Sequence, residues 1–254
     1  MSISENPRVF LLWRRESDQV KPVDPEQIKN NVAIVIDVLR ATTNCIVLLK
    51  NGAKEIHVRI TPEETRNVKE TKFPDALLVG ERNMERIEGF DLGNSPYRND
   101  QESTRNRIGG KIIIFSSTNF PKGLSKAKAA ARIFLGAIVN SNAVAYSSLK
   151  EAKRMKCNIV LVLSGGPSEL KAREDLAAAS LIAKILENEG CILDDFLKED
   201  IKLVEGLEHF AAINSSHARN LCSKGFGDDV IFSVKNVISI VPEYLKDVDK
   251  IILN

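Results

Sequence analysis

The chain has few of the residues that build metal clusters or disulfide frameworks. It holds four cysteines and three histidines among 254 residues. Cys45, Cys157, Cys191 and Cys222 are far apart, without a CxxC pair, and no histidine cluster stands beside them. A zinc centre and a disulfide scaffold both need closer or denser spacing. We therefore expect reduced thiols, a cytoplasmic protein and no zinc ligation by the histidines.

Long apolar runs and an excess of charge of one sign are also missing. The first apolar run covers only Val9 to Trp13 and precedes its arginines, so it does not resemble a signal peptide, and no run approaches the roughly 20 residues of a membrane helix. Lys and Arg number 36 and Asp and Glu 34, for a net charge of +2. The interspersed charges give no general attraction to membranes or nucleic acid. Any anion must be bound by local groups.

Short β-branched runs alternate with stretches of helical spacing. Hydrophobic residues make up 43% and charged residues 28% of the chain, as is typical of globular proteins. The predicted strands are 9–13, 32–36, 76–79, 112–115, 159–163 and 237–241, and the clearest helices are 140–155 and 174–189. Runs that are apolar on both faces are typical of central strands. The pattern predicts a single three-layer α/β/α domain over residues 1–254, with a largely parallel or mixed sheet.

Two regions are less regular. The polar stretch 99–110 (NDQESTRNRIGG) favours a mobile loop or a boundary between two lobes. The region 194–222 is predicted to form several helices, in which His209 and His217 have structural roles.

Polar residues follow the predicted strands, at the edge where α/β sheets gather their chemistry. After the strand 32–36, the segment IDVLRATT places Asp37 at the strand tip, Arg40 beside the next helix, and Thr42 and Thr43 at its start. A carboxylate can hold a metal, a guanidinium can grip phosphate oxygens, and a helix N-terminus favours an anion. A helix cap with a surface ion pair is an equally good interpretation of these residues.

Two more strand ends carry similar groups. The strand 76–79 ends in Gly80-Glu81-Arg82, where glycine would let the chain turn and the charged side chains project from the sheet. The next strand runs into the polar segment 116–119, in which Thr118 and Asn119 can donate hydrogen bonds to phosphate oxygens. A solvated ion pair and a structural turn are the respective alternatives.

The strand 159–163 is followed by glycines. The segment Ser164-Gly165-Gly166-Pro167-Ser168 resembles a phosphate-binding loop, but it lacks the GxGxxG and GxxxxGK[ST] spacings. A standard nucleotide-binding fold is therefore not expected. A helix begins near Arg173, with Glu174 and Asp175 in its first turn, where acids also stabilise any helix start.

The segment IEGFDLGNSPYRN, residues 87–99, is long and rich in turn formers. Two glycines bracket Asp91, and Ser95-Pro96 has the form of an N-cap followed by proline at the first helical position. Asp91 and Asn94 either bond their own backbone or point at a ligand that the glycines let the chain approach.

Taken together, IDVLRATT, GER, IEGFDLGNSP, STN, the glycine pair and EDLAAA resemble the signature segments of the 2-phosphosulfolactate phosphatases. The resemblance extends to Val241-Pro242. It implies a three-layer fold, bound Mg²⁺, and release of phosphate from the small anionic ester 2-phosphosulfolactate, on the route to coenzyme M. The implied catalytic residues are Asp37, Arg40, Glu81, Asp91 and Asp175, whose four acids would bind the metal. The implied substrate-binding residues are Thr42, Thr43, Arg82, Asn94, Ser95, Thr118, Asn119, Gly165, Gly166 and Glu174.

The chain departs from that family pattern at several positions. Phe120-Pro121 follow Asn119 where the family has Gly-Thr, and Asn83 follows GER in place of glycine. Glu169 and Ala172 replace a glycine and a serine. Phenylalanine adds bulk, proline removes a backbone donor, and glutamate would bring negative charge toward an anion. A non-catalytic anion-binding paralogue is therefore the alternative to an enzyme.

The sequence favours a water nucleophile over a covalent aspartyl-phosphate. Leu39 stands two positions after Asp37, where a DxDxT phosphatase has its second carboxylate. One acid outside the metal shell would orient the water. The expected partners are the substrate and Mg²⁺, not nucleic acid or membrane, and a homo-oligomer remains open.

Overall fold

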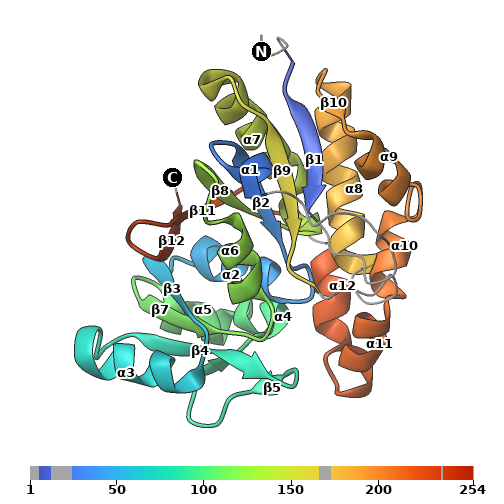
Figure 1. The fold of residues 1–254 in the computed structure, drawn as a ribbon. Helices are drawn as coiled ribbons and strands as arrows, with labels where there is room; N and C mark the ends of the chain where they lie inside the picture. Colours follow the sequence, from blue (N-terminus) through green and yellow to red (C-terminus); the bar gives the residue numbers. More distant parts are fainter. Residues whose placement is uncertain (1–5, 13–24, 166–172, 236, 254) are drawn as a thin grey trace.

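The computed structural model describes residues 6–12, 25–165, 173–235 and 237–253 (Figure 1). The strands are β1 (Arg8–Leu12), β2 (Val32–Ile36), β3 (Glu55–Arg59), β4 (Leu77–Arg82), β5 (Glu85–Arg86), β6 (Leu92–Gly93), β7 (Ile112–Ser116), β8 (Arg132–Gly136), β9 (Ile159–Leu163), β10 (Ile192–Leu193), β11 (Pro242–Leu245) and β12 (Lys250–Leu253). The helices are α1 (Pro25–Ile28), α2 (Ala41–Lys50), α3 (Pro62–Lys72), α4 (Pro96–Asn99), α5 (Glu102–Ile108), α6 (Phe120–Ala127), η1 (Ile138–Asn140), α7 (Ser141–Met155), α8 (Arg173–Asn188), α9 (Asp195–Ile201), α10 (Glu208–Ile213), α11 (Ser216–Ser223) and α12 (Gly227–Lys235).

The described strands form one mixed, largely parallel sheet. Its order is β10-β1-β9-β2-β8-β11-β12-β3-β7-β4-β5, with β6 beside β4. The strands from β10 to β8 are mutually parallel, and β3, β7, β4 and β6 form a second parallel group. The antiparallel hairpin β11–β12 joins the two groups. Three antiparallel pairings separate β8 from β3, so the two parallel groups run in opposite directions along the sheet.

The carboxyl ends of the two groups nevertheless meet. In a flat sheet they would lie at opposite edges. Here the residues that follow β2 and β7, together with the last residues of β4, line one cavity. The strand direction therefore changes between the groups: in Figure 1, β1 and β9 run steeply through the upper part of the molecule, whereas β4 and β5 run across its lower part.

Alternate residues of β2 are buried on opposite faces of the sheet. Val32, Ile34 and Ile36 pack in a core that includes α7 and α8, and Ala33 and Val35 pack in a second core that includes α2 and α6. All five side chains are fully buried. Burial of a valine or isoleucine side chain stabilises the fold by roughly 1.5–3 kcal/mol. Because β2 is buried on both faces, helices cover the sheet on each side, and the result is a three-layer α/β arrangement.

Most predicted elements are confirmed. β2 and β9 match the strands predicted at 32–36 and 159–163, and α7 and α8 begin within one residue of the predicted helices. β1 confirms the N-terminal strand except at Trp13, which lies outside the described residues. Helices α9, α10 and α11 fill the region predicted to be helical.

Two predictions are wrong. Residues 237–241 are not a strand, because Ile238 packs on Val139 and Phe232 in a separate cluster and β11 starts only at Pro242. The stretch 99–110 is not a loop but carries α5, whose last residue, Ile108, is fully buried in the second core. Hydrophobic residues in both places are buried through tertiary contacts that their local pattern does not show.

The sequence indicates a strand end at Gly80, but β4 does not end there. The strand continues to Arg82, and Gly80 pairs with Ser116 of β7 and Gly93 of β6. A Cβ atom on Gly80 would overlap the carbonyl oxygen of Ser116. Glycine is therefore required here for close approach of two strands, not for a turn.

We expect Gly80→Ala to lower the free energy of unfolding by about 2 kcal/mol or more, because β4 and β7 must separate to admit the methyl group. Urea unfolding followed by circular dichroism measures this. Gly109→Ala is the matched control, since its nearest neighbouring atom lies 4.0 Å away. Equal stability of the two variants would contradict the close approach of Gly80 to the backbone of Ser116.

Candidate active site

A cavity of about 170 Å³ lies where the carboxyl ends of β2, β4 and β7 meet. We call it the Asp37 cavity. Six of the predicted residues line it together: Asp37, Arg40, Glu81, Asn94, Thr118 and Asn119. The remaining lining residues are Leu39, Ala41, Asn83, Met84, Ser117 and His217.

The loop after β2 is held in shape by its own threonines. The Thr42 hydroxyl donates to the carbonyl oxygen of Asp37 at 2.8 Å and accepts from its N–H at 3.1 Å. The Thr43 hydroxyl donates to the carbonyl oxygen of Val38 at 2.8 Å. Both threonines are fully buried. The structure thus places these side chains on the loop that carries Asp37 rather than among the lining residues of its cavity.

Asp37 is a buried carboxylate with few hydrogen bonds. Its Oδ1 accepts from the N–H of Ala41 at 3.2 Å. Burial raises the pKa of Asp37 to about 6; Glu81 raises it as well, while the Ala41 hydrogen bond and Arg40 lower it. An ionised Asp37 therefore gains from a nearby cation.

Glu81 is the second acid of the cavity, and it ties two loops together. Its Oε1 accepts from the N–H and hydroxyl of Thr118 at 2.9 and 3.0 Å. Its Oε2 accepts from the N–H of Met84 at 3.0 Å. These bonds hold the β4–β5 turn beside the loop that leads from β7 to α6.

Two more acids lie behind Asp37, in the first turn of α8. Asp175 accepts from the N–H groups of Val38 at 2.8 Å and Gly165 at 3.2 Å. Burial raises the pKa of Asp175 well above its usual range, and Asp37 and Glu174 raise it further. Burial also raises the pKa of Glu174 to about 7, and Asp37 contributes. The Oε2 atom of Glu174 is buried without a hydrogen-bond partner among the described residues. Three buried carboxyl groups thus lie close together, and ionisation of one disfavours ionisation of the others.

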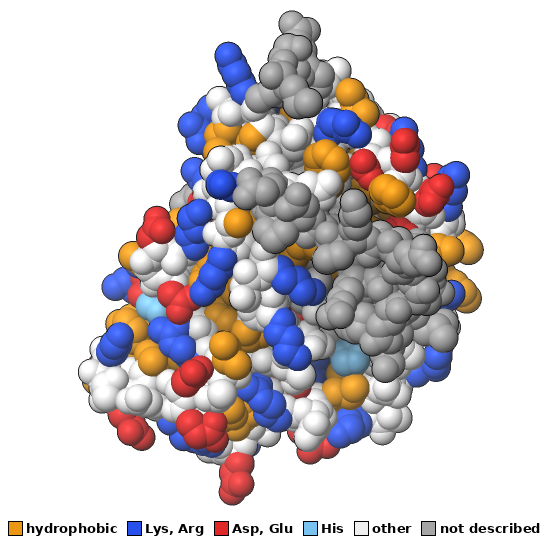
Figure 2. All heavy atoms as spheres, viewed as in Figure 1, with side chains coloured by type: hydrophobic (Ala, Val, Ile, Leu, Met, Phe, Trp, Pro, Cys, Tyr) orange, Lys and Arg blue, Asp and Glu red, His pale blue; other side chains and the backbone are white. Residues whose placement is uncertain are grey.

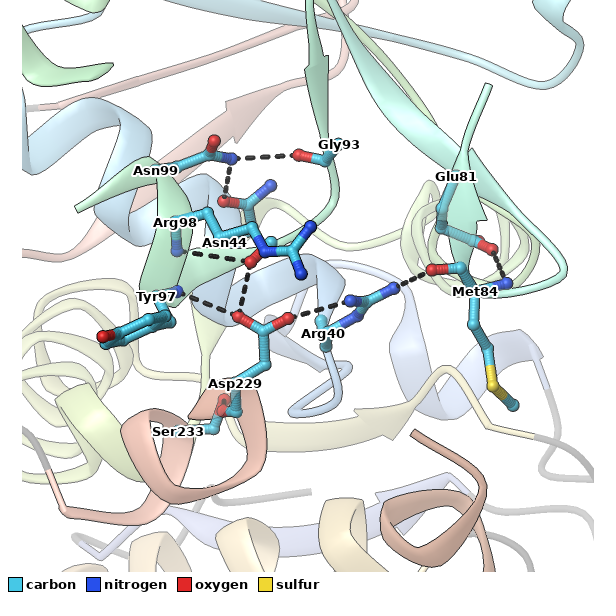
Figure 3. A network of polar contacts seen from close by, with 11 residues as sticks. Arg40, Asn44, Glu81, Met84, Gly93, Tyr97, Arg98, Asn99, Asp229 and Ser233 are labelled. Carbon is cyan, nitrogen blue, oxygen red and sulfur yellow. Dashed lines mark hydrogen bonds and ion pairs between the residues drawn. The ribbon is translucent and has the colours of Figure 1, made fainter. Parts of the chain in front are cut away.

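Arg40 is paired within the protein. Its Nη1 lies 2.9 Å from Oδ2 of Asp229, and its Nη2 donates to the carbonyl oxygen of Met84 (Figure 3). The guanidinium carbon is 4.2 Å from the centre of the Phe226 ring. Both side chains of the ion pair are 2% exposed. Arg40 thus borders the cavity with its charge already matched.

Asp229, at the start of α12, was missed by the sequence analysis. Its Oδ1 accepts from the Ser95 hydroxyl at 2.7 Å and from the N–H of Tyr97 at 3.0 Å (Figure 3). Ser95 also accepts from the N–H of Arg98, which confirms the predicted N-cap. No local motif marks Asp229, because its partners lie more than a hundred positions away in the chain.

Four more of the predicted residues that the structure describes lie outside the lining of the Asp37 cavity. Asp91 accepts from the N–H of Leu78, near the amino end of β4, whereas Glu81 lies near the other end. Arg82 donates to the Ser116 hydroxyl and lines no part of the cavity. Ser95 bonds Asp229 instead of facing the space beside Asp37. Gly165 contributes only its N–H to Asp175, and Gly166, Glu169 and Ala172 lie outside the described residues.

Unpartnered polar atoms border the cavity. Oδ1 of Asn94 and Oγ of Ser117 are buried and have no hydrogen-bond partner among the described residues. Such atoms are uncommon in folded proteins and often mark a ligand site. His217, predicted to be structural, also lines the cavity. Burial lowers its pKa while a hydrogen bond to the Leu39 backbone opposes this, so its imidazole is neutral at pH 7.

Comparison with known proteins identifies the family. The model of the 2-phosphosulpholactate phosphatase family matches residues 18–247. The chain belongs to this family. A probable 2-phosphosulfolactate phosphatase of Carboxydothermus hydrogenoformans is 35% identical over 224 residues, covering 86% of this chain and 90% of the relative. The one of Clostridium perfringens (strain 13) is 33% identical over 87% of this chain and 89% of its own length. The one of Clostridium beijerinckii is 30% identical over 86% of this chain and 90% of its own length. Family membership supports a phosphatase.

Of the departures from the 2-phosphosulfolactate phosphatase pattern, Phe120-Pro121 lies outside the lining of the Asp37 cavity, whereas Asn83 is part of it. Phe120 is fully buried in the second core, with its ring edge-on to Phe115 at 6.2 Å. Pro121 is in the first turn of α6, where a missing N–H is tolerated. Asn83 has a left-handed φ of 52°, which asparagine accepts more readily than most residues. The added bulk of phenylalanine therefore lies in the core rather than in the cavity.

The 2-phosphosulfolactate phosphatase family implies a bound Mg²⁺, and the oxygen donors of this site supply part of the ligand set that Mg²⁺ needs. In the described ranges, no group of three His, Cys, Asp or Glu side chains is arranged to hold a metal ion. Mg²⁺ commonly uses one or two carboxylates, with water and substrate phosphate completing its shell. Asp37 and the unpartnered Oε2 of Glu174 are oxygen donors of that kind.

Helices long and apolar enough to cross a membrane are absent from the part of the chain that the structure describes. On the face seen in Figure 2, Lys and Arg side chains lie among Asp and Glu side chains.

The metal-free protein should lose stability as pH rises from about 4 to about 7. Because the pKa values of Asp37 and Glu174 are raised on folding, the native state binds more protons than the unfolded state in this window, so the free energy of unfolding falls. Glu174→Gln should remove part of this loss. The fall in the free energy of unfolding from pH 5 to pH 8 should therefore be about 1–3 kcal/mol smaller in the variant than in the wild-type protein. Urea unfolding in EDTA measures the difference. An identical pH dependence in both proteins would contradict the burial of this acid.

Proposed function

We propose that the chain is a Mg²⁺-dependent phosphatase that hydrolyses 2-phosphosulfolactate to sulfolactate and phosphate. The observation that carries this proposal is the meeting of Asp37, Glu81, Glu174 and Asp175 around one strand end, in a member of this family. Burial raises the pKa values of Asp37, Glu174 and Asp175, and clusters of such buried acids are typical of functional sites.

Asp37 and Glu174 are the residues that would hold the metal. Each has a carboxylate oxygen free of hydrogen bonds to described residues, while both oxygens of Asp175 accept backbone N–H groups. Asp175 instead fixes the backbone of Val38, beside Asp37. When bound, Mg²⁺ would neutralise charge on the phosphoryl oxygens and act as a Lewis acid.

The size of the Asp37 cavity suits a phosphoryl group rather than a whole metabolite. Its 170 Å³ is below the range of roughly 300–1,000 Å³ typical of drug-sized ligands. Asn94 and Asn119 line it with amide groups that can donate hydrogen bonds to the phosphate, whereas the N–H and hydroxyl of Thr118 already donate to Glu81. The start of α2, at Ala41, also borders it and favours an anion.

Glu81 is the residue that we assign to the attacking water. Its Oε2 accepts one hydrogen bond from Met84, and a carboxylate oxygen can accept a second. Glu81 lies in the same cavity as Asp37 but on the opposite half of the sheet. Leu39 does not supply the second carboxylate of an aspartyl-phosphate site. A water held by Glu81 is therefore the better nucleophile.

Asp37→Asn should reduce phosphate release from 2-phosphosulfolactate by about 10²-fold or more, because it removes a carboxylate charge that would hold Mg²⁺ beside the phosphoryl oxygens. The rate is measured with Mg²⁺ and again with EDTA. Glu243→Gln is the control, since it also alters a buried acid but one paired with Arg132 at the β8–β11 boundary. Substrate binding by the wild-type protein without metal-dependent release would favour the non-catalytic paralogue.

Millimolar Mg²⁺ should raise the melting temperature of the wild-type protein by a few degrees, because a ligand that binds only the native state stabilises it by mass action. Asp37→Asn should lose most of this shift. Differential scanning calorimetry at neutral pH, with Na⁺ matched for ionic strength, separates metal binding from general screening. Equal shifts in the two proteins would remove Asp37 from the metal site.

A further inference from the structure

The Asp37 cavity offers little unpaired positive charge to an anionic ester. Among its described lining residues, Arg40 is the one side chain that is cationic at neutral pH, and it pairs with Asp229. A substrate with acidic groups besides its phosphate must therefore have those groups held elsewhere.

A second cavity, of about 410 Å³, adjoins the first and shares Arg40, Met84 and Asn94 with it. Its lining also includes Arg86 of β5, Arg98 of α4 and Arg107 of α5. We call it the arginine cavity. The shared residues place the two cavities side by side, so a ligand in the first can extend into the second.

The three arginines are not neutralised by the surrounding protein. Within the described ranges, their guanidinium groups make no ion pair or hydrogen bond, and Arg98 lies over the Phe226 ring at 5.1 Å. The nearby acids have other cationic partners. Asp91 pairs with Lys69, Asp100 with Lys50 and Arg105, and Glu85 with Lys224. The positive charge in this cavity is therefore available to a ligand.

The fold holds these arginines along one side of the site. Arg86 lies opposite Glu81 in the β4–β5 pair, and its Cβ is 3.4 Å from the position that a Cβ on Gly93 would take. Arg98 follows the helix start that Ser95 caps, and Arg107 precedes the buried Ile108. Each side chain thus projects from an anchored backbone.

We propose that the arginine cavity is an anion subsite for the acidic groups of the ester that are not transferred. This inference rests on the proposed function and adds the residues that discriminate the substrate: Arg86, Arg98 and Arg107 would hold the carboxylate and sulfonate of 2-phosphosulfolactate. The acids around Asp37 serve the metal and phosphoryl end, and the arginines serve the end that remains on the product. Arginine suits this role, because its planar fork binds carboxylate and sulfonate oxygens in pairs.

The test compares two esters in Arg98→Gln and Arg107→Gln. One ester is 2-phosphosulfolactate, and the other is p-nitrophenyl phosphate, whose leaving group carries no further acid. Loss of one charged contact should lower kcat/KM for 2-phosphosulfolactate about tenfold relative to p-nitrophenyl phosphate, mainly through KM. Arg105→Gln is the matched control, because Arg105 shares α5 with Arg107 but pairs with Asp100 and does not line the cavity. It should leave the ratio unchanged.

Equal losses for both esters, or no loss for either, would overturn the subsite. If the wild-type protein releases phosphate from neither ester, the proposed function fails, and calorimetric binding of sulfolactate then decides the subsite separately. Binding that weakens about tenfold in both arginine variants, but not in Arg105→Gln, would support it. No binding, or equal binding by all proteins, would overturn it.

Discussion

The buried ion pair of Arg40 and Asp229 fixes the geometry on which the site depends. It connects the loop after β2 to α12, and Asp229 also binds the hydroxyl of Ser95 at the start of α4. Removing one partner of a buried pair leaves a charge without compensation, which typically costs 3–5 kcal/mol. Through Met84, the same guanidinium reaches the turn that Glu81 holds. Four segments that are distant in the chain are thereby held at one place.

Electrostatics divide the region around this pair into two parts. On one side, four acids surround the end of β2, and burial and mutual repulsion raise the pKa values of Asp37, Glu174 and Asp175. On the other side, three arginines line a cavity whose nearby acids are already paired. Arg40 and Asp229 form a neutral boundary between them. An ester with its charges at two ends matches this division.

Much of the fold and part of the site follow from local sequence. Asp37, Glu81 and Thr118 stand at strand ends, and the periodic pattern of the strands is enough to locate them. Asp229 could not be found in this way, because its role arises only when α12 packs on α4 and the loop after β2. From the sequence, Asp91 is expected to lie near Asp37. In the structure, Asp91 accepts a hydrogen bond from the N–H of Leu78 instead, because a turn aspartate can bond backbone N–H groups. The apolar segment 237–241 has a strand-like composition, but tertiary packing buries Ile238 outside the sheet.

The opposed directions of the two parallel groups make the enzyme a composite of two halves. Asp37 comes from the half that contains β2, and α8 packs on that half and carries Glu174 and Asp175. Glu81 and the three arginines come from β4 and the segments that follow it. The hairpin β11–β12 is the seam between the halves. Substitutions in β5, α4 and α5 would therefore change which molecules are accepted without altering Asp37, Glu174 and Asp175.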